Sequence, residues 1–116
     1  SVNAGGLRKL MGVGQRVIRG AAHVGGVIVV GASARVRDVL VPVYAALDLD
    51  WRPDTVGSVD DEVGPLSCEQ VAEALLGEFA RDRELVPGRL DAQTLRLASE
   101  LEERHQARPA SEPASS

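Results

Sequence analysis

The residues that could do acid–base or metal chemistry are few and lie far apart in the chain. The sequence holds one cysteine, Cys68, and two histidines, His23 and His105. One cysteine forms neither an intrachain disulfide nor a cysteine-based zinc cage, and the histidines lack a local ligand spacing such as H-x-x-x-H. Cys68 opens a predicted helix, where thiols can become reactive, but no histidine lies near it in the sequence. We therefore interpret Cys68 as a buried apolar thiol and expect no metal site and no cofactor.

Two segments resemble ligand-binding loops but lack the residues that such loops need. In 27–35 a β-branched run precedes a glycine, as in a phosphate-binding loop, but Gly31 is the only glycine there, so neither G-x-G-x-x-G nor G-x-x-x-x-G-K-[ST] is present. The acidic segment from Asp48 loosely follows a calcium loop, yet Pro53 stands where that loop needs glycine and Val59 where it needs glutamate. No serine in these segments lies in a G-x-S-x-G frame. We predict that the protein is not an enzyme.

Charge is distributed unevenly along a chain that is long enough for one small domain. The 116 residues are 44% hydrophobic and 26% charged, with a formal net charge of −4, which excludes a multidomain enzyme and a polyelectrolyte for DNA. Residues 1–37 hold six basic and no acidic side chains, whereas residues 38–78 hold ten acidic side chains against Arg52. The two segments can attract each other within one chain or between chains, or the basic segment can bind an outside anion.

Aromatic residues make up only 3% of the chain, namely Tyr44, Trp51 and Phe79. Aromatic side chains bury the most area per residue, so a core built mainly from aliphatic side chains is thin. We therefore expect marginal stability or help from a partner.

The N-terminal residues 3–22 have the apolar spacing of a helix. Apolar positions recur at intervals of three and one, which places them on one face of a 3.6-residue helix, with basic side chains opposite. Gly12, Gly14 and Gly20 interrupt the pattern, each at ~1 kcal/mol relative to alanine, so the segment should order only against another surface. We predict a basic amphipathic arm that makes its contacts through Leu7, Arg8, Lys9, Leu10, Met11, Arg16, Val17, Ile18 and Arg19.

Residues 24–41 admit two interpretations. The β-branched run 27–30 favours either a short buried strand or the apolar end of the preceding helix, and the sequence does not decide between them. Basic residues before an apolar run that ends in Ala32-Ser33-Ala34 also match a targeting segment, although this run is rich in glycine and lacks leucine. The run is shorter than the ~20 apolar residues of a membrane-spanning helix. We favour an ordinary folded or interface element.

The middle of the chain predicts broken helix followed by loop. Residues 35–47 have helical spacing, but Pro42 lacks an N–H group and disfavours helix at the residue before it. We expect two pieces, the second a short helix that Pro42 opens. The segment 48–66 combines proline, glycine and acidic residues, and we interpret it as an acidic loop.

The C-terminal part carries the clearest helix signals. Ser67 and Gln70 form a capping box, which predicts a helix over 68–84. Asp91 is a second N-cap and predicts a helix over 92–105.

Together these elements predict a mainly α fold whose two C-terminal helices pack as an αα-hairpin over 67–105. The expected organisation has three parts: a basic, glycine-rich arm at 1–34, a small helical domain at 35–106 with the acidic loop 48–66, and a disordered tail at 107–116.

These features favour a non-enzymatic interaction protein that self-associates or docks on a protein partner through its arm, in a multi-subunit particle or shell. One alternative is a peripheral membrane protein anchored on anionic lipid by residues 3–34. Another is a small regulatory or ligand-binding accessory domain. We expect a cytoplasmic location and no sequence-specific nucleic-acid binding, because the second C-terminal helix carries acidic residues among its arginines.

Overall fold

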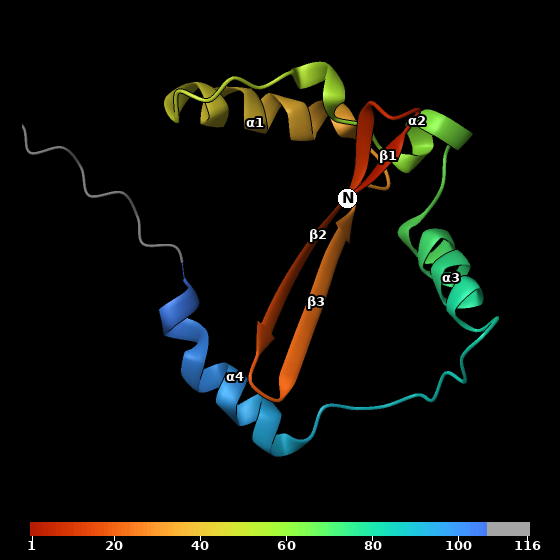
Figure 1. Cartoon of the computed structure of the whole chain (residues 1–116), viewed down its shortest axis with the longest axis vertical. Helices are drawn as coiled ribbons and strands as arrows, with labels where there is room; N and C mark the ends of the chain where they lie inside the picture. Colours follow the sequence, from red (N-terminus) through yellow and green to blue (C-terminus); the bar gives the residue numbers. More distant parts are fainter. Residues whose placement is uncertain (107–116) are drawn as a thin grey trace, which may run out of the picture. The chain divides into compact units, whose positions relative to one another are not determined.

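The chain folds as two units, Ser1–Asp82 and a second unit that begins at Arg83 (Figure 1). The computed structural model describes residues 1–106. The first unit contains an antiparallel sheet of three strands in the order β1-β2-β3, three α-helices and one 3-10 turn, and the second contains one α-helix. The elements are β1 (Val2–Ala4), β2 (Arg8–Ile18), β3 (Ala21–Ile28), α1 (Ser33–Ala46), the 3-10 turn (Pro53–Thr55), α2 (Val59–Val63), α3 (Cys68–Phe79) and α4 (Ala92–His105).

The prediction of a mainly α fold is wrong, because the N-terminal segment forms a β-hairpin instead of an amphipathic helix. Strands β2 and β3 pair from Met11↔Ile28 to Ile18↔Ala21, which leaves a two-residue turn. Gly20 occupies this turn with φ 81°, a conformation that glycine adopts without steric cost. The glycines that weaken a helix are therefore used in a strand and a turn.

The third strand extends only one end of the sheet. Strand β1 pairs with β2 from Ala4↔Arg8 to Val2↔Met11, with a bulge between Val2 and Asn3. Beyond Met11, β2 pairs with β3 alone. The outer part of the hairpin is thus a two-stranded ribbon, and such a ribbon is only marginally stable in water by itself.

The ambiguous residues 24–41 divide between strand and helix. The strand β3 ends at Ile28, so only half of the expected strand 27–30 belongs to it. The next two residues bond to the start of α2 instead. The carbonyls of Val29 and Val30 accept hydrogen bonds from the backbone N–H groups of Val59 and Asp60, each at 2.9 Å. The helix α1 then runs unbroken through Pro42, where two pieces were expected. Proline costs this helix one backbone hydrogen bond without ending it.

The segment interpreted as the acidic loop 48–66 holds more regular structure than a loop. It contains the 3-10 turn and the short helix α2.

The expected C-terminal αα-hairpin is also wrong, although both capped helices form. Helix α3 starts after Ser67, whose side chain accepts from the Gln70 N–H at 3.1 Å while Gln70 Oε1 accepts from the Ser67 N–H at 2.8 Å. Helix α4 starts after Asp91, which accepts from the Thr94 N–H at 2.7 Å. The two helices belong to different units and do not form the predicted pair. The expected tail 107–116 lies outside the described residues.

Burial is slight throughout the part of the chain that the structure describes. No apolar side chain there is fully buried, and the buried positions are Ser33, Gly57 and Ser58. Half-buried aliphatic residues gather where β2 and β3 meet the rest of the first unit, including Leu10, Met11 and Ile28. The composition predicts a thin core. In the described structure this core consists of side chains that are only partly buried.

Candidate assembly surface

The hairpin of β2 and β3 has two unlike faces beyond its base. Paired residues of an antiparallel ladder share a face, and successive residues alternate between faces. The register therefore defines an apolar face, formed by Val13, Gln15, Val17, Ala22, Val24 and Gly26. It also defines a polar face, formed by Gly14, Arg16, Ile18, Ala21, His23 and Gly25. The surroundings of two glycines agree with this assignment of the faces. A Cβ at Gly26 would meet Met11 and Val13, whereas a Cβ at Gly25 would meet His23.

The apolar face is open to solvent in the described structure. Val17 and Val24 expose 73% and 66% of their surface, and Val13 exposes 47%. Gln15 is the one polar side chain on this face. In Figure 1 the hairpin runs out beyond the helices α1 and α3 of its unit. Contiguous exposed apolar surface of this kind typically marks an interaction site.

Helix α1 lies beside the base of the hairpin on the side that continues the polar face. Gly12 and Val27 of the sheet and Leu40 of the helix line a groove of about 220 Å³. Tyr44 and Trp51 stack at its edge, with ring centroids 4.6 Å apart and planes at 11°. This volume is below the roughly 300–1,000 Å³ of ordinary small-molecule sites. The groove therefore gives little support to a ligand-binding role.

Helix α3 lies beside the base on the opposite side, which continues the apolar face. Met11 and Ile28 of the sheet face Val71 and Leu75 of the helix across a groove of about 290 Å³. Its lining is almost entirely apolar, with Glu78 as the one charged residue. The apolar face therefore runs from the open part of the hairpin into this groove.

The base of the hairpin is fixed to α2 and to the residues just before it by polar contacts. The Arg8 Nε–H donates to Glu62 Oε1 at 2.7 Å. The terminal nitrogen Nη2 of Arg8 forms an ion pair with the same oxygen at 2.6 Å. This hydrogen bond and the charge of Glu62 raise the pKa of Arg8 above its ordinary value. The backbone N–H of Gly57 donates to the Lys9 carbonyl at 3.2 Å. The N-terminal basic segment is thus bound to the acidic segment within the chain at this one end.

A small polar cluster holds the start of α1 against α2. The Asp61 carboxylate accepts from the backbone N–H of the fully buried Ser58 at 3.1 Å. Hydrogen bonds from the Ser33 hydroxyl, then from Ser58, and the charge of Arg37 lower the pKa of Asp61 below 3.8. These groups bond to one another, so the cluster joins α1 to α2 and provides no free acid or base.

A carboxylate of the same chain lies beside the loop that precedes α1. Ala32 precedes the helix with φ 58° and offers no side-chain cap. A Cβ on Gly31 would lie 2.7 Å from Asp60 Oδ2, so that carboxylate lies directly beside this loop.

The predicted contact residues divide between the two ends of the hairpin. Leu7 lies in the turn before β2, and Arg8–Met11 lie at the base beside the helices. Arg16–Arg19 lie at the tip, on both faces and in the turn. The prediction missed Val13 and Val24, which carry much of the apolar face. An alternating pattern from Met11 to Val17 was the signal that would have found Val13.

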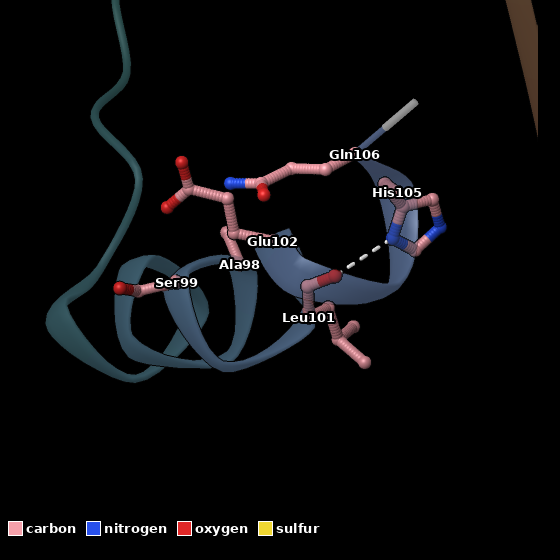
Figure 2. Close-up of a pocket in the computed structure, with 6 residues that line it drawn as sticks. All are labelled: Ala98, Ser99, Leu101, Glu102, His105 and Gln106. Atoms are coloured by element: carbon pink, nitrogen blue, oxygen red, sulfur yellow. Dashed lines mark hydrogen bonds between the residues drawn. The ribbon is translucent and has the colours of Figure 1, made fainter. Parts of the chain in front are cut away.

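The remaining candidates for chemistry stay apart. Cys68 is exposed, so its interpretation as a buried thiol is wrong, and the described residues show no cluster of three His, Cys, Asp or Glu side chains that could hold a metal. His105 Nδ1 donates to the Leu101 carbonyl at 2.9 Å within α4. Figure 2 shows the hollow beside it, which among residues 1–106 is lined by α4 residues and Gln106, with no reactive group from another described element.

Comparisons with known proteins supply no family: no family model, no curated protein and no solved structure matches the chain. Within residues 1–106, no helix has the length and apolar character needed to cross a bilayer.

Proposed function

We propose that the chain is a non-enzymatic assembly protein that self-associates through its N-terminal hairpin, as a subunit of a multi-subunit particle or shell. The observation that carries this proposal is the combination of an open apolar face with the lack of any fully buried apolar side chain in residues 1–106. Burying apolar surface contributes roughly 25 cal/mol per Å² and is the main favourable term in folding and association. A chain that is 44% hydrophobic and leaves this surface open gains most by covering it with another chain.

The charge pattern supports association between chains. At the base of the hairpin, Arg8 is neutralised by Glu62 of the same chain. At the tip, Arg16 and Arg19 have no acidic partner among the described residues. Exposed charges of one sign next to an apolar face set the register and orientation of a contact more than its affinity. The acidic surface of another copy is the nearest source of compensating charge.

The polar chemistry of the chain supports a non-enzymatic role. The lowered pKa of Asp61 comes from hydrogen bonds that hold two elements together, and the Arg8–Glu62 pair does the same. Such ion pairs and capped carboxylates are common structural features. We propose a cytoplasmic location, which suits an exposed free cysteine because cytoplasmic thiols stay reduced.

Light scattering and sedimentation velocity on the full chain test the proposal. We expect a mass above that of one chain, 12.3 kDa, which rises with protein concentration and falls as salt is raised from about 50 to about 500 mM. Chemical unfolding should shift to higher denaturant with increasing protein concentration, because association stabilises the folded state. A strict monomer at every concentration and salt, with a concentration-independent unfolding midpoint, would overturn the proposal.

A membrane surface is the second candidate, favoured by the composition of the hairpin tip. Val17 and Ile18 are exposed there by 73% and 56%, between Arg16 and Arg19. Basic side chains beside apolar ones suit an anionic lipid surface. Flotation with vesicles of anionic and of neutral lipid tests this candidate on the full chain. Binding to anionic vesicles that Val17→Asp abolishes, in a chain that is monomeric in solution, would favour the membrane over self-association.

A further inference from the structure

We propose that the occupant of the hairpin is a second copy of the chain, which adds its own β3 antiparallel to β3 and continues the sheet across a two-fold axis near Val24 and Gly25. This inference rests on the proposed function and names the atoms that make the contact.

Alternate residues of β3 direct their backbone groups away from β2. In a two-residue hairpin the pair that closes the turn, here Ile18↔Ala21, exchanges backbone hydrogen bonds, and every second pair does so thereafter. The Val29 N–H donates to the Leu10 carbonyl at 2.9 Å, as this alternation requires. The residues between them, Ala22, Val24 and Gly26, therefore offer N–H and C=O groups to the outside edge.

This outer edge of β3 is open along the strand. Strand β3 is the last in the order β1-β2-β3, and no other described segment pairs with it between Ala21 and Ile28. The strand AAHVGGVI contains no Lys, Arg, Asp, Glu or Pro. Natural edge strands usually carry such residues to prevent pairing with another chain. An eight-residue edge without them is suited to strand addition.

The outer edge of β2 is a poorer site for the same contact. Strand β1 already covers it from Arg8 to Met11. The free remainder carries Arg16 and ends next to Arg19, so two β2 strands in antiparallel pairing would bring basic side chains of both copies together. Like charges across a ladder are destabilising. The uncharged β3 has no such conflict with its own copy.

A second copy also supplies opposite charge at both ends of the contact. Antiparallel pairing about Val24 and Gly25 places the Arg19 turn of one copy beside residues 29–31 of the other. The Asp60 N–H bonds to the Val30 carbonyl, and the Asp60 carboxylate lies beside Gly31, so the acidic helix α2 begins there. Each basic tip thus lies near the Asp60 carboxylate of the other copy, although Arg35 of that copy also lines the hollow at Gly31. The pairing itself leaves the two apolar faces open. They lie on one side of the joined sheet and form a continuous surface that further copies in the proposed particle would cover.

Matched proline variants on the two edges test this pairing in the full chain. Gln15 and Val24 lie opposite each other, and both direct their N–H groups outward on opposite edges, where proline removes no bond of the hairpin itself. We expect Val24→Pro to weaken self-association by at least about tenfold and Gln15→Pro to change it by less than about twofold. Val24→Thr keeps the N–H group and the branched shape, so it separates the backbone contribution from that of the apolar side chain.

Amide exchange on the unmodified protein gives a second readout that needs no variant. At high protein concentration the N–H groups of Ala22, Val24 and Gly26 should become protected, while those of Gln15 and Val17 on the β2 edge stay unprotected. An associated protein in which Val24→Pro has no effect and the Val24 N–H exchanges freely would overturn the β3 pairing and leave assembly through another surface. A chain that stays monomeric would overturn this inference together with the proposed function.

Discussion

At Gly57 the backbone before α2 lies against β2 too closely for a side chain. A Cβ there would lie 3.0 Å from Arg8 Cβ and 3.1 Å from Leu10 Cδ2, and the Gly57 N–H bonds to the Lys9 carbonyl. Arg8 Cβ is tied to its strand and cannot turn aside. We predict that Gly57→Ala lowers the free energy of unfolding by about 1–3 kcal/mol, measured by chemical denaturation.

Gly77 is the matched control for that substitution, since it lies within α3 and a Cβ there would meet nothing within 4 Å. Gly77→Ala should instead stabilise by up to about 1 kcal/mol, because alanine favours the helix. Equal effects of the two alanines would contradict the close approach at Gly57.

We expect the Asp61 carboxylate to give the fold a pH dependence at acid pH. Its pKa is lowered by the Ser33 and Ser58 hydrogen bonds and by the charge of Arg37. Because the folded pKa lies below the ordinary value of 3.8, the ionised carboxylate stabilises the fold above pH 3.8, and this contribution is lost as the pH falls through the folded pKa. We predict that Asp61→Asn lowers stability at neutral pH and that its loss of stability below pH 3.8 is smaller than that of the unmodified protein.

Thermal unfolding measured at several pH values would show this as two curves that converge at acid pH. Asparagine can still accept from the Ser58 N–H, so the variant removes the charge and keeps an acceptor. Parallel curves for the two proteins would show that Asp61 is not the source of the pH dependence.

Helices were predicted correctly where the signal for them lies within a few residues of the sequence. The capping residues Ser67 and Asp91 act within one turn, and the helices begin where those residues place them. Neither cap carries information on what the helix packs against, so the αα-hairpin did not follow from them.

The N-terminal hairpin shows why the same apolar residues can predict the wrong element. Leu10, Met11, Val17 and Ile18 fit a helical face by their spacing, but they also occupy strand positions beside glycines. The choice depends on long-range partners, such as the Val59 and Asp60 N–H groups that hold the end of β3. With the spacing of a helix, Val13 does not lie on the apolar face of the predicted arm. Val24 lies outside residues 3–22, for which that helix was predicted. The predicted contact residues therefore include Val17 of the apolar face and omit Val13 and Val24.

The association between copies should depend on the charge at the hairpin tip. The proposed pairing places Arg19 of one copy beside the acidic α2 of another, and interactions between exposed charges are screened within about 10 Å at 0.1 M salt. We predict that Arg19→Glu weakens self-association at low salt and reverses its salt dependence, because screening would then reduce a repulsion. Sedimentation velocity across salt concentrations measures both effects.

Arg96→Glu on α4 is the control for net charge. Each variant makes the formal net charge of −4 more negative by two, but Arg96 belongs to the second unit and not to the hairpin. If repulsion between copies of high net charge governed association, both variants would weaken it equally and both would associate more tightly as salt rises. If the tip lies beside α2 of another copy, only Arg19→Glu reverses the slope. The sign of the salt dependence in this pair therefore distinguishes a specific contact at the tip from general charge repulsion.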